Sequence, residues 1–239
     1  MTFPSVTSTA TSFHTSAVTT HTVNMPSTVA NDFIVILAAT DGSPTTVPPT
    51  GFTELFDSGG LHVFIKVATG SEGGTVTFST SAAETSAHIT LAGNNWFEDL
   101  AGIEISASAS ATSSSPNPDS VTASWGSDDN LFIANFAATR GDRTTTGYPS
   151  NYTGSNIDNP NGVGGAGAQM ACATRNLAAS NDDPGAFSTS GSVPYVASTI
   201  VIRPSGGGGG GGRIMSSLAA GGGLVGHGGI AGRSGGLAG

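Results

Sequence analysis

Three short acidic runs are the residues whose types and spacing come closest to a binding site. They are Glu98-Asp99, Asp128-Asp129 and Asn181-Asp182-Asp183. Hard cations such as Ca²⁺ need several oxygen ligands that converge on one point, and acidic loops can supply them. The D-x-D-x-D-G spacing of a calcium-binding loop is absent, however. The sequence therefore favours solvated acidic loops, with a calcium site as the alternative.

The histidines, the cysteine and the serines show no spacing that indicates catalysis. No two of the five histidines have HxH or HxxxH spacing, and none lies beside a cysteine, so no zinc site is predicted. We expect His62 and His88 to be surface or hydrogen-bonded residues of strands, and Cys172 to be a small core residue. No nucleophile motif stands out, and no Lys follows the glycine cluster of residues 162–169. We predict neither an enzyme nor a cofactor.

Aromatic residues offer another kind of site, because their rings can stack on sugar rings. The chain has two tryptophans and three tyrosines. In a β-sandwich of this size tryptophans more often fill or flank the core. We therefore expect Trp96 and Trp125 in or beside the core, and they are candidate glycan contacts only for the alternative function given below.

The elements that must position these residues are strands, and one strand occurs twice. Residues 31–42 read NDFIVILAATDG, and 99 residues later residues 130–141 read NLFIANFAATRG. Such a run is too short for a typical helix, and its Phe, Ile and Val content predicts a buried strand. The tetrad FSTS also occurs twice, at residues 78–81 and 187–190, with Lys66 and Arg175 at the same distance before it.

This pattern predicts an all-β fold, an antiparallel, jelly-roll-like β-sandwich with two internally similar halves. The halves are residues 31–93 and 130–203, each with five strands spaced about ten residues apart. A single half would leave one apolar sheet face uncovered. We therefore expect residues 1–204 to form one domain.

Residues 205–239 differ from this body, because 17 of these 35 residues are glycine. Residues 205–212 are a flexible polyglycine linker by composition. Residues 213–239 repeat an apolar residue every six positions, which places these residues on one face of an extended chain. A Gly-rich segment cannot offset its ordering entropy alone, so this register predicts docking on a partner or on other copies. The candidate docking residues are Ile214, Met215, Leu218, Leu224, Ile230 and Leu237.

The charge is divided between body and tail. The chain has a net charge of −9, and all 16 carboxylates precede Pro204, whereas Arg213 and Arg233 follow it. An acidic body disfavours nucleic acid and would repel an anionic membrane. The N-terminus does not read as a secretory signal, and no stretch of 18 apolar residues is present. We expect synthesis in a cytoplasm and no internal disulfide, because Cys172 is the single cysteine.

Several segments resemble a β-sandwich domain that recurs in structural proteins of tailed bacteriophages. They are GFTEL (51–55), LHVFIKVATGSEGGTVTFS (61–79), NLFIANFAATRG (130–141), YPSNYTG (148–154), ATRNLAASNDDPGAFS (173–188) and IVIRP (200–204). The ending RIMSSLAAGGGLVGHGGIAGRSGGLAG is similar to Gly-rich C-termini of such proteins. The resemblance covers nearly the whole chain and includes no catalytic residues.

The resemblance implies a bacteriophage virion structural protein, made in the host cytoplasm. We expect a capsid decoration or outer appendage subunit whose tail docks on other virion proteins of the capsid or tail. By analogy with phage decorations and fibres we expect a homo-oligomer, with a trimer favoured. The alternative is a receptor- or glycan-binding module of a tail fibre or adhesin, which contacts a host surface glycan through Trp96 or Trp125. Neither function involves nucleic acid or a membrane.

Overall fold

The computed structural model describes residues 2–152, 159–160 and 167–206 of the chain. Within these ranges the chain forms antiparallel strands and one short 3-10 helix, η1 (Leu100–Gly102). The predicted all-β sandwich is therefore confirmed. The linker beyond Gly206 and the candidate docking residues from Ile214 to Leu237 lie outside the described residues.

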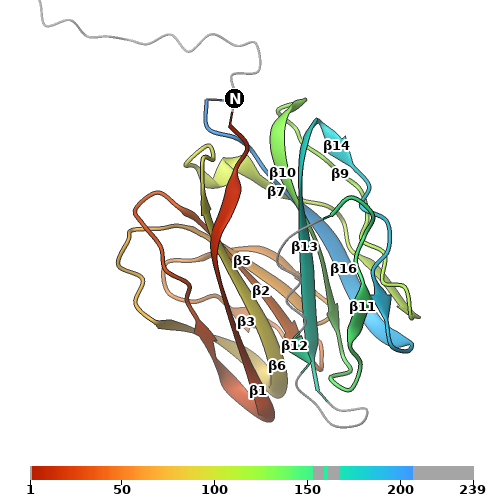
Figure 1. Cartoon of the computed structure of the whole chain (residues 1–239). Helices are drawn as coiled ribbons and strands as arrows, with labels where there is room; N and C mark the ends of the chain where they lie inside the picture. Colours follow the sequence, from red (N-terminus) through yellow and green to blue (C-terminus); the bar gives the residue numbers. More distant parts are fainter. Residues whose placement is uncertain (1, 153–158, 161–166, 207–239) are drawn as a thin grey trace, which may run out of the picture. The chain divides into compact units, whose positions relative to one another are not determined.

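Two large sheets form the sandwich, and each comes from one half of the chain (Figure 1). The first has the order β1-β6-β2-β5-β4 with β3 paired to β6, and the second has the order β12-β13-β10-β16-β7 with β8 paired to β16. The strands of the first sheet are β1 (Ser5–Asn24), β2 (Phe33–Thr40), β3 (Thr46–Val47), β4 (Thr53–Ser58), β5 (Leu61–Val67) and β6 (Thr75–Asn94). Those of the second are β7 (Ile103–Ile105), β8 (Ala109–Ser113), β10 (Asp128–Ala138), β12 (Asn159–Pro160), β13 (Gln169–Ala179) and β16 (Val193–Ile202). Two further pairs are β11 (Thr145–Gly147) with β15 (Ser188–Thr189), and β9 (Val121–Thr122) with β14 (Asn181–Asp182).

The two halves share one topology. In the first half the central strand β2 lies between β6, the last strand of that half, and β5. In the second half the central strand β10 lies in the same way between β16, the last strand, and β13. The short strands also correspond, because Thr46 lies opposite Thr80 in the first half and Thr145 lies opposite Thr189 in the second. The internal similarity that the repeated segments predict is thus present in the strand order.

The sequence match between β2 and β10 differs by one residue from their match in the structure. Ile34 lies opposite Lys66, and Phe132 lies opposite Arg175. Since Lys66 and Arg175 hold the same place in the two halves, Phe132 corresponds to Ile34, although the sequence aligns it with Phe33. A shift of one residue turns a side chain to the other face of a sheet. Phe33 accordingly faces the other sheet, whereas Phe132 faces away from it.

Three apolar clusters hold the body together. The central core lies between the sheets and includes Val35 and Ile133. The first outer core, with Ile34 and Phe78, covers the far face of the first sheet, and the second outer core, with Phe136, covers the far face of the second. All eight residues of β2 are buried because both faces of this strand are covered. This explains its continuous apolar run, in place of the alternation of a half-exposed strand.

Strands β1 and β6 form a long ribbon that bends back over the first outer core. Its pairing runs from Ser5 opposite Asn94 to Asn24 opposite Thr75, with register irregularities between His14 and Thr20. Such irregularities sharpen the local bend of a strand. The hydroxyl of Thr90 donates to the Asn24 carbonyl at 3.0 Å, so the far end of the ribbon returns to the middle of the sheet. Residues 75–94 therefore form one bent strand.

Candidate functional site

Four histidines from distant parts of the sequence meet under the bend of the β1-β6 ribbon. His14 and His21 come from β1, His62 from β5 and His88 from β6. The ring centroids of His14, His21 and His88 lie 5.5 to 6.1 Å apart. Phe78 stacks on His21 at 4.7 Å and also contacts the rings of His88 and His62. We call His14, His21, His62 and His88 the histidine cluster.

His21 and His88 are completely buried and bonded to hydroxyl groups. The Nδ1 atom of His21 lies 2.7 Å from the Ser86 hydroxyl, and its Nε2 atom lies 3.0 Å from the Thr80 hydroxyl. The Nδ1 atom of His88 lies 3.0 Å from the Ser12 hydroxyl. A hydroxyl can both donate and accept, so these partners suit a neutral imidazole with one donor and one acceptor nitrogen.

The other two histidines have more polar surroundings. His62 is also buried, but its Nδ1 atom lies 2.9 Å from the Asp57 carboxylate and its Nε2 atom 3.0 Å from the Thr40 hydroxyl. His14 is partly exposed, and its Nε2 atom accepts a hydrogen bond from the backbone N–H of Thr22 at 2.8 Å. The expectation that His62 and His88 are hydrogen-bonded is confirmed, and a surface position is wrong for both.

Burial disfavours the protonated form of the three enclosed imidazoles. It lowers the pKa of His21 to about 4, with His14 and His62 adding to the effect, and lowers the pKa of His88 well below its usual value. Burial also lowers the pKa of His62, although the charge and hydrogen bond of Asp57 oppose it. All three rings are therefore neutral at pH 7.

A pair of carboxyl groups lies near this cluster. The Asp41 carboxylate accepts a hydrogen bond from the Thr85 backbone N–H at 2.9 Å. Burial, together with the hydrogen bond and charge of Asp41, raises the pKa of Glu84 to about 7. A side chain at Gly42 would collide with the Glu84 carboxyl, so a glycine permits this close approach. Glu84 therefore takes up a proton near neutral pH.

The side chains of the histidine cluster are not arranged as a metal site. Among the described residues, no group of three or more His, Cys, Asp or Glu side chains is placed to hold a metal ion. In the histidine cluster, both ring nitrogens of His21 lie at hydrogen-bond distance from hydroxyls. The histidine cluster can take up protons, but each proton would place a positive charge in a buried position.

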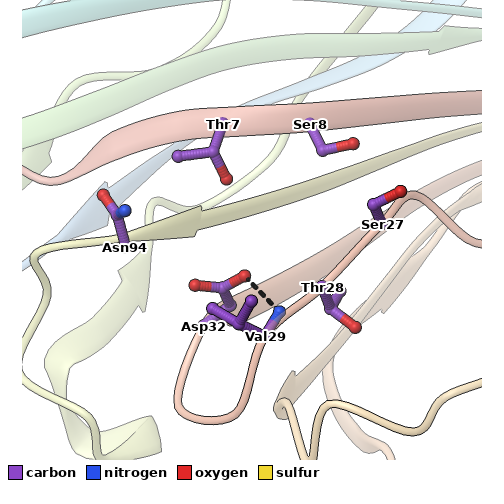
Figure 2. A pocket seen from close by; sticks show the side chains of 7 residues that line it. All are labelled: Thr7, Ser8, Ser27, Thr28, Val29, Asp32 and Asn94. Atoms are coloured by element: carbon purple, nitrogen blue, oxygen red, sulfur yellow. Dashed lines mark hydrogen bonds between the residues drawn. The ribbon is translucent and has the colours of Figure 1, made fainter.

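A shallow pocket of about 340 Å³, lined mostly by residues with polar side chains and called the polar pocket below, lies beside the first part of β1. Figure 2 shows the side chains of Thr7, Asp32 and Asn94 pointing toward the space between them. One Asp32 oxygen accepts from the Val29 N–H at 2.9 Å, and the Asn94 amide oxygen accepts from the Ser5 hydroxyl at 3.0 Å. Hydroxyl, carboxylate and amide groups suit a small hydroxylated ligand. The lining residues are Thr7, Ser8, Ser27, Thr28, Val29, Asp32 and Asn94.

One of the three acidic runs is engaged in a partly buried ion pair. Asp182 accepts from the Arg175 guanidinium at 2.8 Å and from the Tyr152 hydroxyl at 2.8 Å. Burial and the Asp182 carboxylate raise the pKa of Tyr152, which keeps this hydroxyl a donor. These bonds tie the β13-β14 turn to the loop that contains Tyr152. Asp182 therefore has a structural role in this conformation, in place of a solvated loop.

The first half contains the counterpart of this ion pair. Lys66, which corresponds to Arg175, lies 3.2 Å from the Glu72 carboxylate and 5.4 Å from the ring centroid of Phe52. Burial alone would raise the pKa of Glu72, but hydrogen bonds from Thr69, Thr28 and Lys66 outweigh it and lower this pKa to about 2. Phe52 and Tyr152 follow equivalent turns, closed by bonds to the carbonyls of residues 49 and 149. The ion pair is thus a duplicated element of the fold.

The remaining acidic residues have local roles. Asp99 caps η1 by accepting from the Ala101 N–H at 2.9 Å, and Asp128 accepts from the Asp129 N–H at 2.9 Å. In the described part of the chain, the three acidic runs form no common cation site. The calcium alternative has no geometric support from these residues.

The two tryptophans differ in their availability. Trp96 is 1% exposed, and its indole N–H donates to the Asn31 carbonyl at 2.7 Å. Trp96 is therefore corrected from a candidate glycan contact to a core residue, because no ring face is accessible. Trp125 is partly exposed and donates to the Asn130 amide oxygen at 3.0 Å. The Arg203 guanidinium lies 5.8 Å from the Trp125 ring centroid.

Comparison with protein-family models, with curated proteins and with solved structures finds no match for this chain. No helix among the described residues has the length and hydropathy of a membrane span.

Cys172 is buried in the central core, where burial raises the pKa of its thiol to about 12, so the expected core role is confirmed.

The histidine cluster is the feature that spacing along the chain does not predict. One sequence signal does point to it. His62 lies between Leu61 and Val63, and His88 lies between Ala87 and Ile89, all of them core residues. In a sandwich whose strands are buried on both faces, a histidine flanked in this way is enclosed as well.

Proposed function

We propose that the chain is a structural subunit of a bacteriophage virion, a capsid decoration or outer appendage subunit anchored through its Gly-rich C-terminal tail. One observation carries the proposal. An acidic β-sandwich ends at Pro204, and the chain continues as a basic, Gly-rich segment with apolar residues at a spacing of six. Attachment and body thus occupy separate parts of the sequence.

The point where the tail leaves the body is well held. β16 ends at Ile202, Pro204 forms a bridge with Trp96, and the Ser205 N–H donates to the Asn95 carbonyl at 2.9 Å. Because Trp96 is part of the central core, this exit point is fixed to the sandwich. A fixed exit is what a subunit needs if its body is to be carried at a defined place by a docked tail.

The resemblance to phage sandwich domains supports the same proposal. Its segments coincide with elements that build the sandwich: LHVFIKV is β5, NLFIANFAA lies in β10 and IVI ends β16. The partners would be other virion proteins and further copies of this chain.

The test is incorporation into particles during infection. A chain that ends at Ser205 should fold, with an unchanged β-sheet circular dichroism spectrum, but should be missing from purified virions. Replacing Leu218, Leu224 and Ile230 by Ser should have the same effect, whereas replacing Ser216 and Ser217 by Ala, a matched change in the same tail, should not. Normal incorporation of the truncated chain would refute tail anchoring, and absence of the intact chain from particles would refute the virion role.

A receptor- or glycan-binding module is the second candidate. The polar pocket favours it, because its hydroxyl, carboxylate and amide groups match the hydrogen-bonding groups of sugars. With Trp96 buried, Trp125 is the remaining aromatic contact of the two. Binding of the folded chain to host envelope glycans, measured on immobilised saccharides, tests this function.

A further inference from the structure

The part of the β1-β6 ribbon that contains His21 is held less by the rest of the sheet than the part that contains His14 and His88. Residues 86–93 of β6 pair with both β1 and β2. Residues 75–80 pair with β1 and β3 only, so the ladder with β2 does not reach them. We call residues 18–24 and 75–84 the folded-back end of the ribbon. Its position depends on packing against the first outer core, on the hydrogen bonds of Asn24 to Thr90 and Ser12, and on the histidine cluster.

We propose that the histidine cluster is an acid-sensitive switch, whose protonation releases the folded-back end of the ribbon and uncovers the first outer core. This goes beyond the proposed virion role and does not depend on it. The apolar surface that would be uncovered includes Ile34, Ile36, Phe64 and Phe78, which are all completely buried at present or nearly so.

Protonation opposes the closed arrangement through desolvation and repulsion. His21 and His88 have no exposed surface, and their ring centroids are 6.1 Å apart. A charge on either ring must be buried beside another imidazole, and charges on both rings repel each other. Opening the folded-back end would return both rings to water, where an imidazolium is well solvated.

The charged groups around the cluster decide which histidines respond. Asp57 and Glu54 of β4 face His62 and favour its protonated form, so a charge there is partly compensated. Asp41 acts in the same direction on His21, but burial, His14 and His62 outweigh it. For His88 the acting groups are burial and the three other histidines, all of which disfavour its charge. Glu84 holds a proton below about pH 7 and supplies no compensating charge in acid. His88 and His21 are therefore the responding pair.

The direction of the pH effect follows from the lowered pKa values. A histidine whose pKa is lower in the closed state than in the open state binds more protons when open. The closed state is therefore fully stable above the ordinary histidine value of 6.5 and loses stability as the pH falls from there toward about 4. At pH 4.5 a histidine whose pKa falls from 6.5 when open to about 4 when closed, as for His21, favours opening by roughly 80-fold, and His88 acts in the same direction.

Hydrogen exchange read by mass spectrometry on the full chain tests the switch. Labelling times at pH 7.0 and pH 4.5 are scaled for the intrinsic exchange rate. We expect the folded-back end to lose protection at pH 4.5 while residues 33–40 keep theirs, with recovery at pH 7.0. Binding of an apolar fluorescent dye should rise in parallel.

His88→Gln is the matched variant, because Gln keeps hydrogen-bonding capacity and does not take up a proton. It should reduce the acid-induced loss of protection about a hundredfold, whereas His227→Gln, which removes a histidine outside the cluster, should change nothing. If His88→Gln does not fold, the imidazole NMR signals of the unmodified chain decide the question. Retained protection at pH 4.5, simultaneous loss across the whole sandwich, or cluster histidines that titrate near pH 6.5 in the folded protein would each overturn the proposal.

Discussion

At the scale of single residues, one hydroxyl distinguishes the two corresponding ion pairs. Glu72 receives hydrogen bonds from Thr69 and Thr28 as well as its ion pair with Lys66. Asp182, its counterpart, has instead the Tyr152 hydroxyl. A phenylalanine is present at the position equivalent to Tyr152, where no hydroxyl is needed.

This difference predicts the effect of removing the hydroxyl. Tyr152→Phe leaves one oxygen of the buried Asp182 without that donor, and hydrogen bonds to charged groups contribute about 1.5–3 kcal/mol. We expect the free energy of unfolding in urea to fall by about 2 kcal/mol, with an unchanged denaturant slope. Tyr195→Phe is the control, because Tyr195 is equally buried and its hydroxyl makes no hydrogen bond to the residues that the structure describes. Equal losses for both variants would contradict the assigned role of Asp182.

Some residue roles were predictable from the sequence, and others required the third dimension. Cys172 lies among small apolar residues, and this local composition is enough to predict a core position. Trp96 could not be separated from Trp125 in the same way, because its side chain packs on Phe33 and bonds to Asn31, both more than sixty residues away in the sequence. The histidine cluster depends on the bend of a ribbon that joins both ends of the first half.

At the scale of elements, pattern predicts the strands well and their facing less well. The duplicated apolar runs are β2 and β10, and the turn signals at Pro49 and Pro149 precede corresponding aromatic residues. The sequence match nevertheless aligns Phe33 with Phe132, which lie on opposite faces. Both faces of these strands are buried, so apolar residues on either face satisfy the pattern. The pattern therefore does not show the correct register.

Gly93 of β6 lies between the first residues of β1 and the central strand β2. A Cβ atom at Gly93 would collide with the Ser5 carbonyl and with the ring of Phe33. Gly93→Ala should therefore push the first residues of β1 from the sheet and destabilise the protein by about 1–3 kcal/mol. Gly74→Ala is the matched control, because nothing lies within 4 Å of a Cβ there. Thermal melts followed by circular dichroism would show the difference, and an unchanged midpoint for Gly93→Ala would argue against this packing.

At the scale of the whole molecule, the body is one compact unit with two similar halves. Among the described residues, eleven of the buried residues in the central core precede residue 97 and ten follow it. Each sheet therefore depends on the other to cover one face, as a two-layer architecture requires. The sequence predicts this dependence from the repeat alone, but not the two outer cores, which are closed by the bent ribbon and by loops.

Separating the halves tests this dependence. Residues 1–97 and 98–239 divide the chain at the exposed Glu98, between the last strand of the first sheet and η1. Either fragment alone would expose its share of the central core, so we expect each to bind an apolar dye and to melt without a cooperative transition. Mixed in equal amounts, the fragments should recover a cooperative melt. The control is the intact chain cleaved after folding at a protease site inserted at the same place, which should stay native. A cooperative melt of residues 1–97 alone would instead mean that each half is an independent domain, and that the similarity of the halves reflects two domains placed side by side.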